Sequence, residues 1–372
     1  MLKLHLINPE LTKRLKHRNY LVTRFLDTLN VDYEIVENDP DWIVIHPLFG
    51  NYLLDDKNLL LNLSQDNLDR FKQGKCNLLV WYPYETEHYG DPNVPRQIEG
   101  CLNAVDYKGD KVFLVTGNLN AELKSYPISK VEPVKSIPLL FFDWQLYDFL
   151  SERNETNQLQ STVTYKNNKS KAYMCLNGKD KHTRRYLLDR LPLEQGHVSY
   201  VCYDGVDPYI KSDTKVPIIL DQEKHSIKRN DRWMNPEIYH DAYINVVTEA
   251  FPDKEIDCFI TEKTFKPMLH LQPFMIQGNR YTLRRLREYG YQTFSDIWDE
   301  SYDELETWQE RTDAMLEQLH SFCTLSTHDQ LAKCKQVMSK LRHNQEMVFN
   351  TASDVTRSAY LADILRAVSE GG

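Results

Sequence analysis

Short apolar runs alternate with longer amphipathic stretches through the first part of the chain. One such stretch, residues 11–29, repeats its apolar positions with a period near that of a helix. Strands that alternate with helices indicate a mostly parallel sheet covered by helices. The runs that have the length and apolar content of buried strands are residues 2–8, 41–47, 77–83, 111–117 and 137–143.

The alternation starts again after a polar stretch at residues 151–170, which we interpret as a linker. A helix is expected at 182–191, and residues 204–235 are rich in loop formers. From Tyr302 onward the pattern is helical, and residues 353–369 predict a last amphipathic helix. In this second part we expect buried strands at 171–177, 196–204, 242–250, 257–263 and 273–278.

Composition limits the class of protein. No window of about 18 apolar residues is present, and the first residues lack the pattern of a signal peptide. The seven cysteines are dispersed, odd in number and without a CxxC pair. We therefore expect a cytoplasmic protein with reduced thiols, no membrane span and no zinc site.

Charge is unevenly distributed along the chain. The net charge of −9 argues against a protein that coats nucleic acid. Residues 166–185 and 224–232 are nevertheless strongly basic, whereas residues 299–306 are acidic. An acidic protein with local basic stretches suits an anionic ligand held in a cleft.

Residues 257–278, DCFITEKTFKPMLHLQPFMIQG, carry the most informative chemistry. Pro267 is tolerated only near a helix start, so the helix is predicted to begin close to Thr261 or Thr264. Unpaired N–H groups at that start, together with Lys263, favour phosphate. Glu262 can accept two hydroxyl hydrogen bonds from a sugar. A solvated Glu-Lys pair at a helix start explains the same letters.

This stretch resembles the donor-binding signature of the α-1,3-fucosyltransferase family and its bacteriophage-encoded relatives. The resemblance extends over roughly residues 171–300, and the chain departs from the pattern at Leu271-Gln272 and at the Ala-Phe after Glu249, so the identity of the sugar is not carried over. The matching positions are Phe259, Thr261, Glu262, Lys263, Pro273 and Gly278, an upstream Glu249, and the segment YMCLNGKDKHTRRYLLDRL with Asn177 and Arg184 or Arg185.

The resemblance implies an inverting, metal-independent glycosyltransferase with the GT-B fold, in which two Rossmann-like α/β/α domains face a cleft. An acceptor-binding domain is expected at 1–160, a nucleotide-sugar domain at 161–350, and a helix at 351–372 that crosses back to the first domain. No cofactor besides the donor is implied.

The same resemblance assigns roles to the donor site. Arg184 or Arg185 neutralises the diphosphate, Lys263 stabilises the leaving group, and Asn177 lies in the adjoining turn. Glu262 holds the ribose, and Glu249 holds a hydroxyl of the donor sugar.

An inverting transfer also needs a general base, expected in the first domain. The loop after LLVW offers Glu85 as first choice and Glu87 as second, with Tyr84 and His88 beside them as acceptor contacts. Asn118, after Gly117, is another candidate contact with the acceptor. Ordinary loop acids and a tight turn explain these letters equally well.

The acceptor itself is open. It is a glycan or a hydroxymethylated base in phage DNA. The basic runs would provide phosphate contacts to DNA. If the protein is encoded by a phage, we expect it in the host cytoplasm. A non-catalytic protein that binds a nucleotide sugar or a glycan through a degenerate site is the alternative function. The sequence leaves the oligomeric state undetermined.

Overall fold

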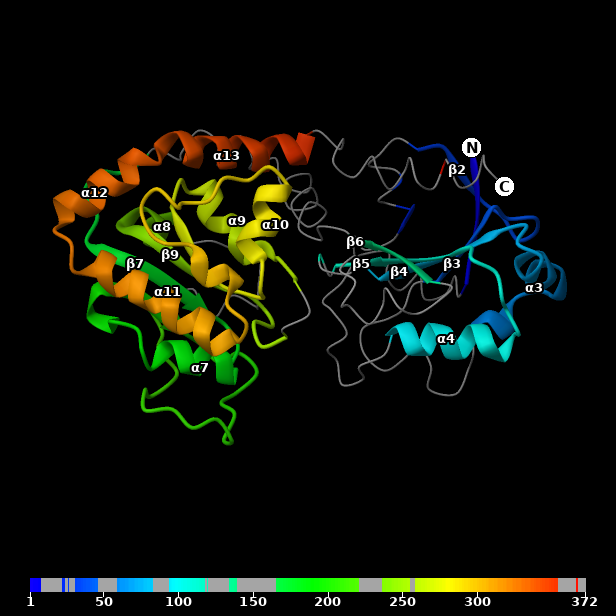
Figure 1. Cartoon of the computed structure of the whole chain (residues 1–372), viewed down its shortest axis with the longest axis horizontal. Coiled ribbons are helices and arrows are strands. Elements are labelled where there is room, and N and C mark those ends of the chain that lie inside the picture. The colour runs from blue at the N-terminus through cyan, green and yellow to red at the C-terminus, as the bar shows by residue number, and fades with distance from the viewer. Residues whose placement is uncertain are drawn as a thin grey trace. The chain divides into compact units, whose positions relative to one another are not determined.

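The chain divides into two compact units, Met1–Trp144 with Asp354–Gly372, and Gln145–Ser353. The sequence places these divisions near residues 160 and 350. The computed structural model describes residues 1–7, 22–23, 26, 31–45, 59–82, 94–117, 119, 134–138, 165–220, 236–254, 258–353 and 366, drawn in colour in Figure 1.

The first unit contains a six-stranded parallel sheet in the order β2-β1-β3-β4-β5-β6. Four of the expected runs form strands here, and the fifth overlaps the end of β6. The short β2 was not expected, because it offers only three residues and one of them is exposed. The strands are β1 (Leu2–Leu6), β2 (Tyr33–Ile35), β3 (Trp42–Ile45), β4 (Asn77–Tyr82), β5 (Val112–Thr116) and β6 (Val134–Pro138).

Aromatic side chains fill the core of the first unit. Trp42 is fully buried in the central part of the sheet, with its ring centroid 5.2 Å from that of Phe113. Phe71 of α3 stacks on Tyr107, in the connection between α4 and β5, at 4.1 Å. The helical segments described in this unit are η1 (Leu59–Asn62), α3 (Gln65–Lys72) and α4 (Val94–Ala104).

The second unit contains a four-stranded parallel sheet in the order β10-β9-β7-β8. Its strands are β7 (Lys171–Asn177), β8 (Gly196–Tyr200), β9 (Ala242–Thr248) and β10 (Phe274–Gln277). The chain passes from β7 to β8 on one side and then returns to β9 on the other side of β7. Such a reversal creates a crevice at the carboxyl ends of the two strands, where open α/β sheets bind ligands. In this unit the crevice is expected between β7 and β9.

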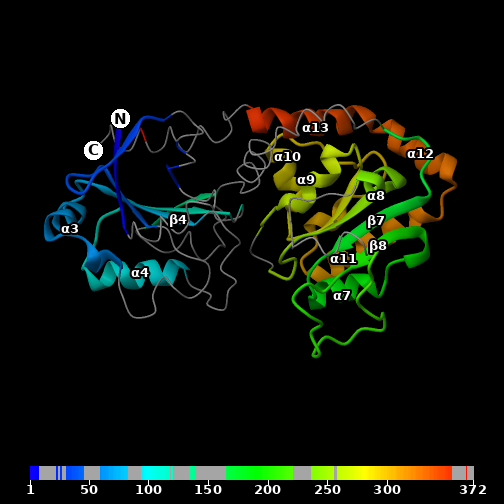
Figure 2. The same ribbon diagram turned by 180° about the vertical axis from the view of Figure 1, so that it is seen from behind.

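Helices cover the second sheet. The long α11 crosses the sheet in front of β7 in Figure 1 and behind it in Figure 2, so it covers one face, whereas α9 packs against β9 and β10. No helix in the described part of the chain is both long and apolar enough to cross a bilayer. The helices are α7 (His182–Leu188), α8 (Pro236–Asp241), α9 (Glu262–Leu269), α10 (Thr282–Glu288), α11 (Trp308–Cys323), α12 (Thr327–Gln336) and α13 (Met338–Ser353), with short 3-10 turns η3 (Leu193–Gln195) and η4 (Ser301–Glu304).

One expected strand is absent. Residues 258–260 are buried, as their apolar character predicts, but they do not pair with the sheet. The backbone N–H of Phe259 donates to the side chain of Asn279 at 3.2 Å instead of to a neighbouring strand. An apolar run signals burial, and burial alone does not specify strand pairing.

A buried histidine lies at the opposite end of α9. His270 is 3% exposed, and its ring stacks on Tyr239 with a centroid distance of 4.3 Å. Neither ring nitrogen has a hydrogen-bond partner. Burial, together with the nearby His240, Lys169 and Lys266, lowers the pKa of His270 to about 3. The imidazole is therefore neutral at physiological pH.

Two parallel sheets, each with its own helices, form a mixed α/β protein whose architecture is compatible with two Rossmann-like domains.

Candidate anion-binding site

The two strands at the reversal are joined by a side-chain hydrogen bond. Thr248, at the end of β9, donates its hydroxyl to Oδ1 of Asn177, at the end of β7, at 2.6 Å. Gly178 follows directly, and a Cβ added there would lie 2.8 Å from the ring of Tyr203. The backbone after β7 is therefore packed closely, and Asn177 holds it against β9.

Arg184 extends from α7 into this region. Its side chain is 3% exposed, although it carries a full positive charge. Two nitrogens make long contacts of 3.4 Å with the carbonyls of Lys179 and Thr248, and Nε has no partner. No carboxylate of the described residues lies within ion-pair distance of this guanidinium. Burial lowers the pKa of Arg184 below its ordinary value.

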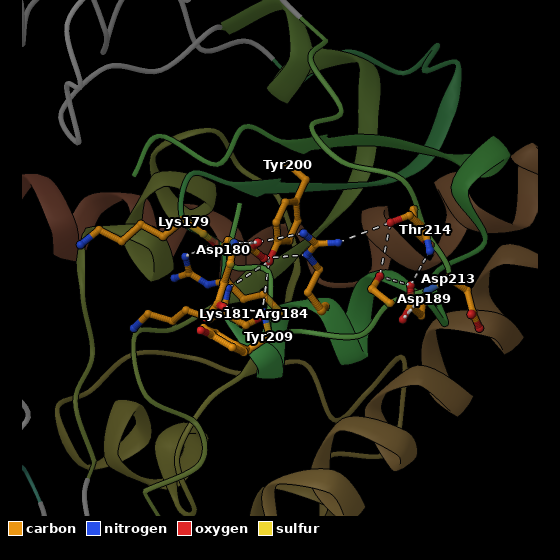
Figure 3. A network of polar contacts seen from close by, with 12 residues as sticks. Lys179, Asp180, Lys181, Arg184, Asp189, Tyr200, Tyr209, Asp213 and Thr214 are labelled. Carbon is orange, nitrogen blue, oxygen red and sulfur yellow. Dashed lines mark hydrogen bonds and ion pairs between the residues drawn. The ribbon is translucent and has the colours of Figure 1, made fainter. Parts of the chain in front are cut away.

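Arg185, the next residue, is in a different situation. Its Nε and Nη2 donate to the two oxygens of Asp180 at 2.6 and 2.8 Å. Asp180 also accepts from the hydroxyl of Tyr200 and from the N–H of Asp207 (Figure 3). The charge of Arg185 is thus already balanced, and the pair attaches the segment after β8 to α7.

A second carboxylate attaches the same segment further along. Asp189 accepts from the hydroxyl of Ser212 at 2.7 Å and from the N–H of Thr214 at 3.0 Å (Figure 3). Tyr209, between these two attachments, is 91% exposed. The segment therefore forms an arch that is attached to Asp180, just before α7, and to Asp189, just after it.

The start of α9 supplies the second cation. Thr261, one of the two starts that the sequence offers, is the N-cap and accepts a hydrogen bond from the backbone N–H of Lys263 at 3.4 Å. Nζ of Lys263 donates to Thr261 Oγ1 at 3.0 Å and to Glu262 at 2.8 Å. The side chains of Lys263 and Glu262 remain 30% and 23% exposed, so both reach the surface.

The charged groups at the start of α9 influence one another's pKa values. Burial alone would raise the pKa of Glu262, but Lys263 and Lys266 outweigh it and hold that pKa at about 2. Burial lowers the pKa of Lys263, whereas the charges of Glu262 and Glu249 raise it more strongly and Arg184 opposes them. At neutral pH the site therefore holds charged groups of both signs.

Glu249 is fully buried directly after β9. Its carboxylate accepts from the N–H and the hydroxyl of Thr261, at 3.0 and 2.6 Å, and from the hydroxyl of Thr264 at 2.5 Å. Burial raises the pKa of Glu249, and the charge of Lys263 acts in the opposite direction. The described contacts of this carboxylate all go to the first turn of α9.

The fold thus brings together five predicted residues, Asn177, Arg184, Glu249, Glu262 and Lys263, at the carboxyl edge of the second sheet. Arg185 lies beside them but is held by Asp180. The remaining predicted residues lie outside the described part of the chain; they are Tyr84, Glu85, Glu87, His88 and Asn118.

Sequence reasoning missed the contacts of four residues in this region. The sequence does signal Thr264 as a possible start of the helix, but not that its hydroxyl donates to Glu249. Asp180 and Thr248 had no such signal, because their partners are remote in sequence or depend on loop conformation. Lys181 is a further case, since it donates to the Ala250 carbonyl at 2.6 Å.

Comparison of the sequence with protein-family models and with curated proteins finds no match. Among the described residues, no group of three or more His, Cys, Asp or Glu side chains is placed to hold a metal ion. The chemistry must therefore be inferred from the geometry. A buried guanidinium that forms no ion pair with any described carboxylate lies near a helix start that presents a lysine and a glutamate.

Proposed function

We propose that the carboxyl edge of the second unit binds the pyrophosphate of a nucleotide sugar. The observation that supports this proposal is the state of Arg184. Burial of an unpaired charge is unfavourable by several kcal/mol, and a ligand that supplies the missing negative charge repays it. A phosphate fits this requirement, because the planar guanidinium donates two parallel hydrogen bonds to phosphate oxygens.

The start of α9 supplies further groups that suit a nucleotide. The first turn of α9 directs partial positive charge toward an anion, and Lys263 adds a full charge on a side chain that is 30% exposed. Glu262 is ionised and 23% exposed, so it can accept hydrogen bonds from two vicinal hydroxyls of a ribose. Phosphate, ribose and leaving-group stabilisation are then all accounted for by residues of one edge.

On this basis we propose an inverting glycosyltransferase of GT-B architecture, which the likeness to the α-1,3-fucosyltransferase signature also favours. Arg184 and Lys263 balance the negative charge that builds on the departing nucleoside diphosphate. The general base belongs to the first unit in this proposal, with Glu85 preferred to Glu87. The acceptor hydroxyl is that of a glycan or of a hydroxymethylated base in DNA.

Ligand binding tests the site. Titration calorimetry of the full chain is run against inorganic pyrophosphate, nucleoside diphosphates and their sugars. Arg184→Met removes the charge at similar length, and Arg190→Met, on a 44% exposed side chain nearby in sequence, is the matched control. We expect at least one nucleotide to bind the wild type, to bind Arg184→Met at least tenfold more weakly, and to bind the control unchanged. Absence of wild-type binding, or equal binding by Arg184→Met, refutes the proposal.

Turnover separates an enzyme from a binding protein. A transferase releases nucleoside diphosphate slowly from its nucleotide sugar when water replaces the acceptor, whereas a non-catalytic binder does not. Glu85→Gln is expected to abolish transfer and to leave donor affinity intact. Turnover that survives in this variant removes Glu85 from the mechanism.

A further inference from the structure

The contacts of Glu249 differ from those of a residue that awaits a ligand. Its side chain is fully buried, and a carboxylate offers about four acceptor positions. Three of them are filled by Thr261 and Thr264, at distances between 2.5 and 3.0 Å. The remaining acceptor position belongs to a fully buried side chain, so a sugar hydroxyl could reach it only if the surrounding residues moved.

The hydroxyl of Thr261 links Glu249 to Lys263. A hydroxyl has one proton, and here that proton is donated to Glu249 at 2.6 Å. The lone pairs of Thr261 Oγ1 then face Nζ and the backbone N–H of Lys263, at 3.0 and 3.4 Å. The carboxylate thus determines which way the hydroxyl points, and the hydroxyl in turn determines where the ammonium group of Lys263 is held.

We propose that Glu249 is a positioning residue, which fixes the first turn of α9 and the direction of Lys263 without touching the sugar. The inference rests on the proposed function, because it assigns how one cation of that site is placed. Glu249→Gln retains the volume but changes one acceptor into an amide donor. The amide competes for the Thr261 oxygen, so the hydroxyl can no longer present both lone pairs to Lys263.

Two ligands distinguish positioning from sugar contact. The affinity of Glu249→Gln is measured for a nucleoside diphosphate and for the corresponding nucleotide sugar. A positioning residue weakens both by the same factor, which we expect to be about tenfold or more, as for the loss of a buried charged hydrogen bond. A residue that holds a sugar hydroxyl weakens only the nucleotide sugar, and that result overturns the proposal.

A measurement without ligand tests the positioning role of Glu249 separately from the identity of the ligand. Hydrogen exchange of the amides at the start of α9 is followed in the unliganded wild type and in Glu249→Gln. Faster exchange in the variant is expected whether or not a nucleotide binds the wild type. If none binds, only the proposed function is refuted. Unchanged exchange overturns the positioning role.

Thr264 provides a second variant in case Glu249→Gln does not fold. Thr264→Val deletes one donor to Glu249 at nearly constant volume, and Thr264→Ser keeps it. We expect Thr264→Val to weaken both ligands by one common factor, smaller than that of Glu249→Gln, and Thr264→Ser to restore most of the affinity. Equal affinities of Thr264→Val and Thr264→Ser would show that the hydroxyl of Thr264 does not help to position Glu249.

Discussion

Replacing Arg184 by methionine should stabilise the unliganded protein, although the same substitution should weaken binding of the proposed ligand. The guanidinium is 3% exposed and lacks an acidic partner among the described residues. The guanidinium donates two long contacts of 3.4 Å to carbonyl oxygens, and its Nε donates no hydrogen bond. Contacts of that length lie beyond the usual range of strong hydrogen bonds, so the desolvation of the charge is poorly offset.

The size of the effect follows from these contacts. Buried ion pairs replaced by apolar residues of similar volume often gain about 1–4 kcal/mol of stability. Methionine has a comparable length and adapts to irregular spaces, but it leaves two carbonyls with one partner fewer, which costs about 1 kcal/mol. We therefore expect a net gain of about 2 kcal/mol for Arg184→Met, or roughly 4–8 °C in Tm for a unit of this size.

Thermal unfolding of the unliganded full chain measures this gain, with Arg190→Met as the control that should leave Tm within about 2 °C of wild type. Saturating nucleotide should raise the Tm of the wild type and not that of Arg184→Met. If Arg184→Met instead lowers the Tm of the unliganded protein by several degrees, the arginine serves mainly to join Lys179 and Thr248, and the argument for an anion is wrong.

Three further predictions concern stability and local order. The pKa of His270 is about 3 in the folded state and 6.5 when unfolded, so the wild type loses stability as pH falls from 7 to 5 whereas His270→Phe does not. The difference in free energy of unfolding should therefore shift by about 2 kcal/mol in favour of the variant at pH 5. A difference that stays constant in urea titrations from pH 7 to 5 contradicts this. Asp180→Asn should loosen the arch after β8 and raise tryptic cleavage at Lys211 several-fold, whereas an unchanged digest shows that Asp189 alone holds the arch. Thr307→Ala breaks the capping box of α11 with Glu310 and should lower stability by about 1 kcal/mol in denaturant unfolding; an unchanged midpoint shows that the cap is replaced by water.

Strands that are buried on both faces were the most predictable part of the fold. The run at 171–177 forms β7 with the expected bounds, because a short continuous apolar segment between polar flanks suits a central parallel strand. The start of α9 was equally readable, since Thr261 caps it and Pro267 limits where it begins. The run at 258–260 was misread because buried coil and buried strand share the same composition.

The site was only partly readable, for a physical reason. Arg184 and Arg185 are adjacent, and their roles differ through Asp180, whose position depends on the fold of the turn after β7. Likewise the partners of Glu249 are set by how closely β9 approaches α9, a tertiary distance that spacing along the chain does not encode. The sequence thus predicted which residues lie near the site, but not which charged side chains pair with one another.

The division of the chain has a consequence for its biosynthesis. Because Gln145–Ser353 lies between the two segments of the other unit, it is complete on the ribosome before Asp354–Gly372 has been translated. Domains generally fold as units, so the first unit cannot complete its native structure until Asp354–Gly372 has been synthesised, after the whole of the inserted unit. The polypeptide also crosses between the units twice, and a single proteolytic cut at either crossing leaves them covalently joined through the other.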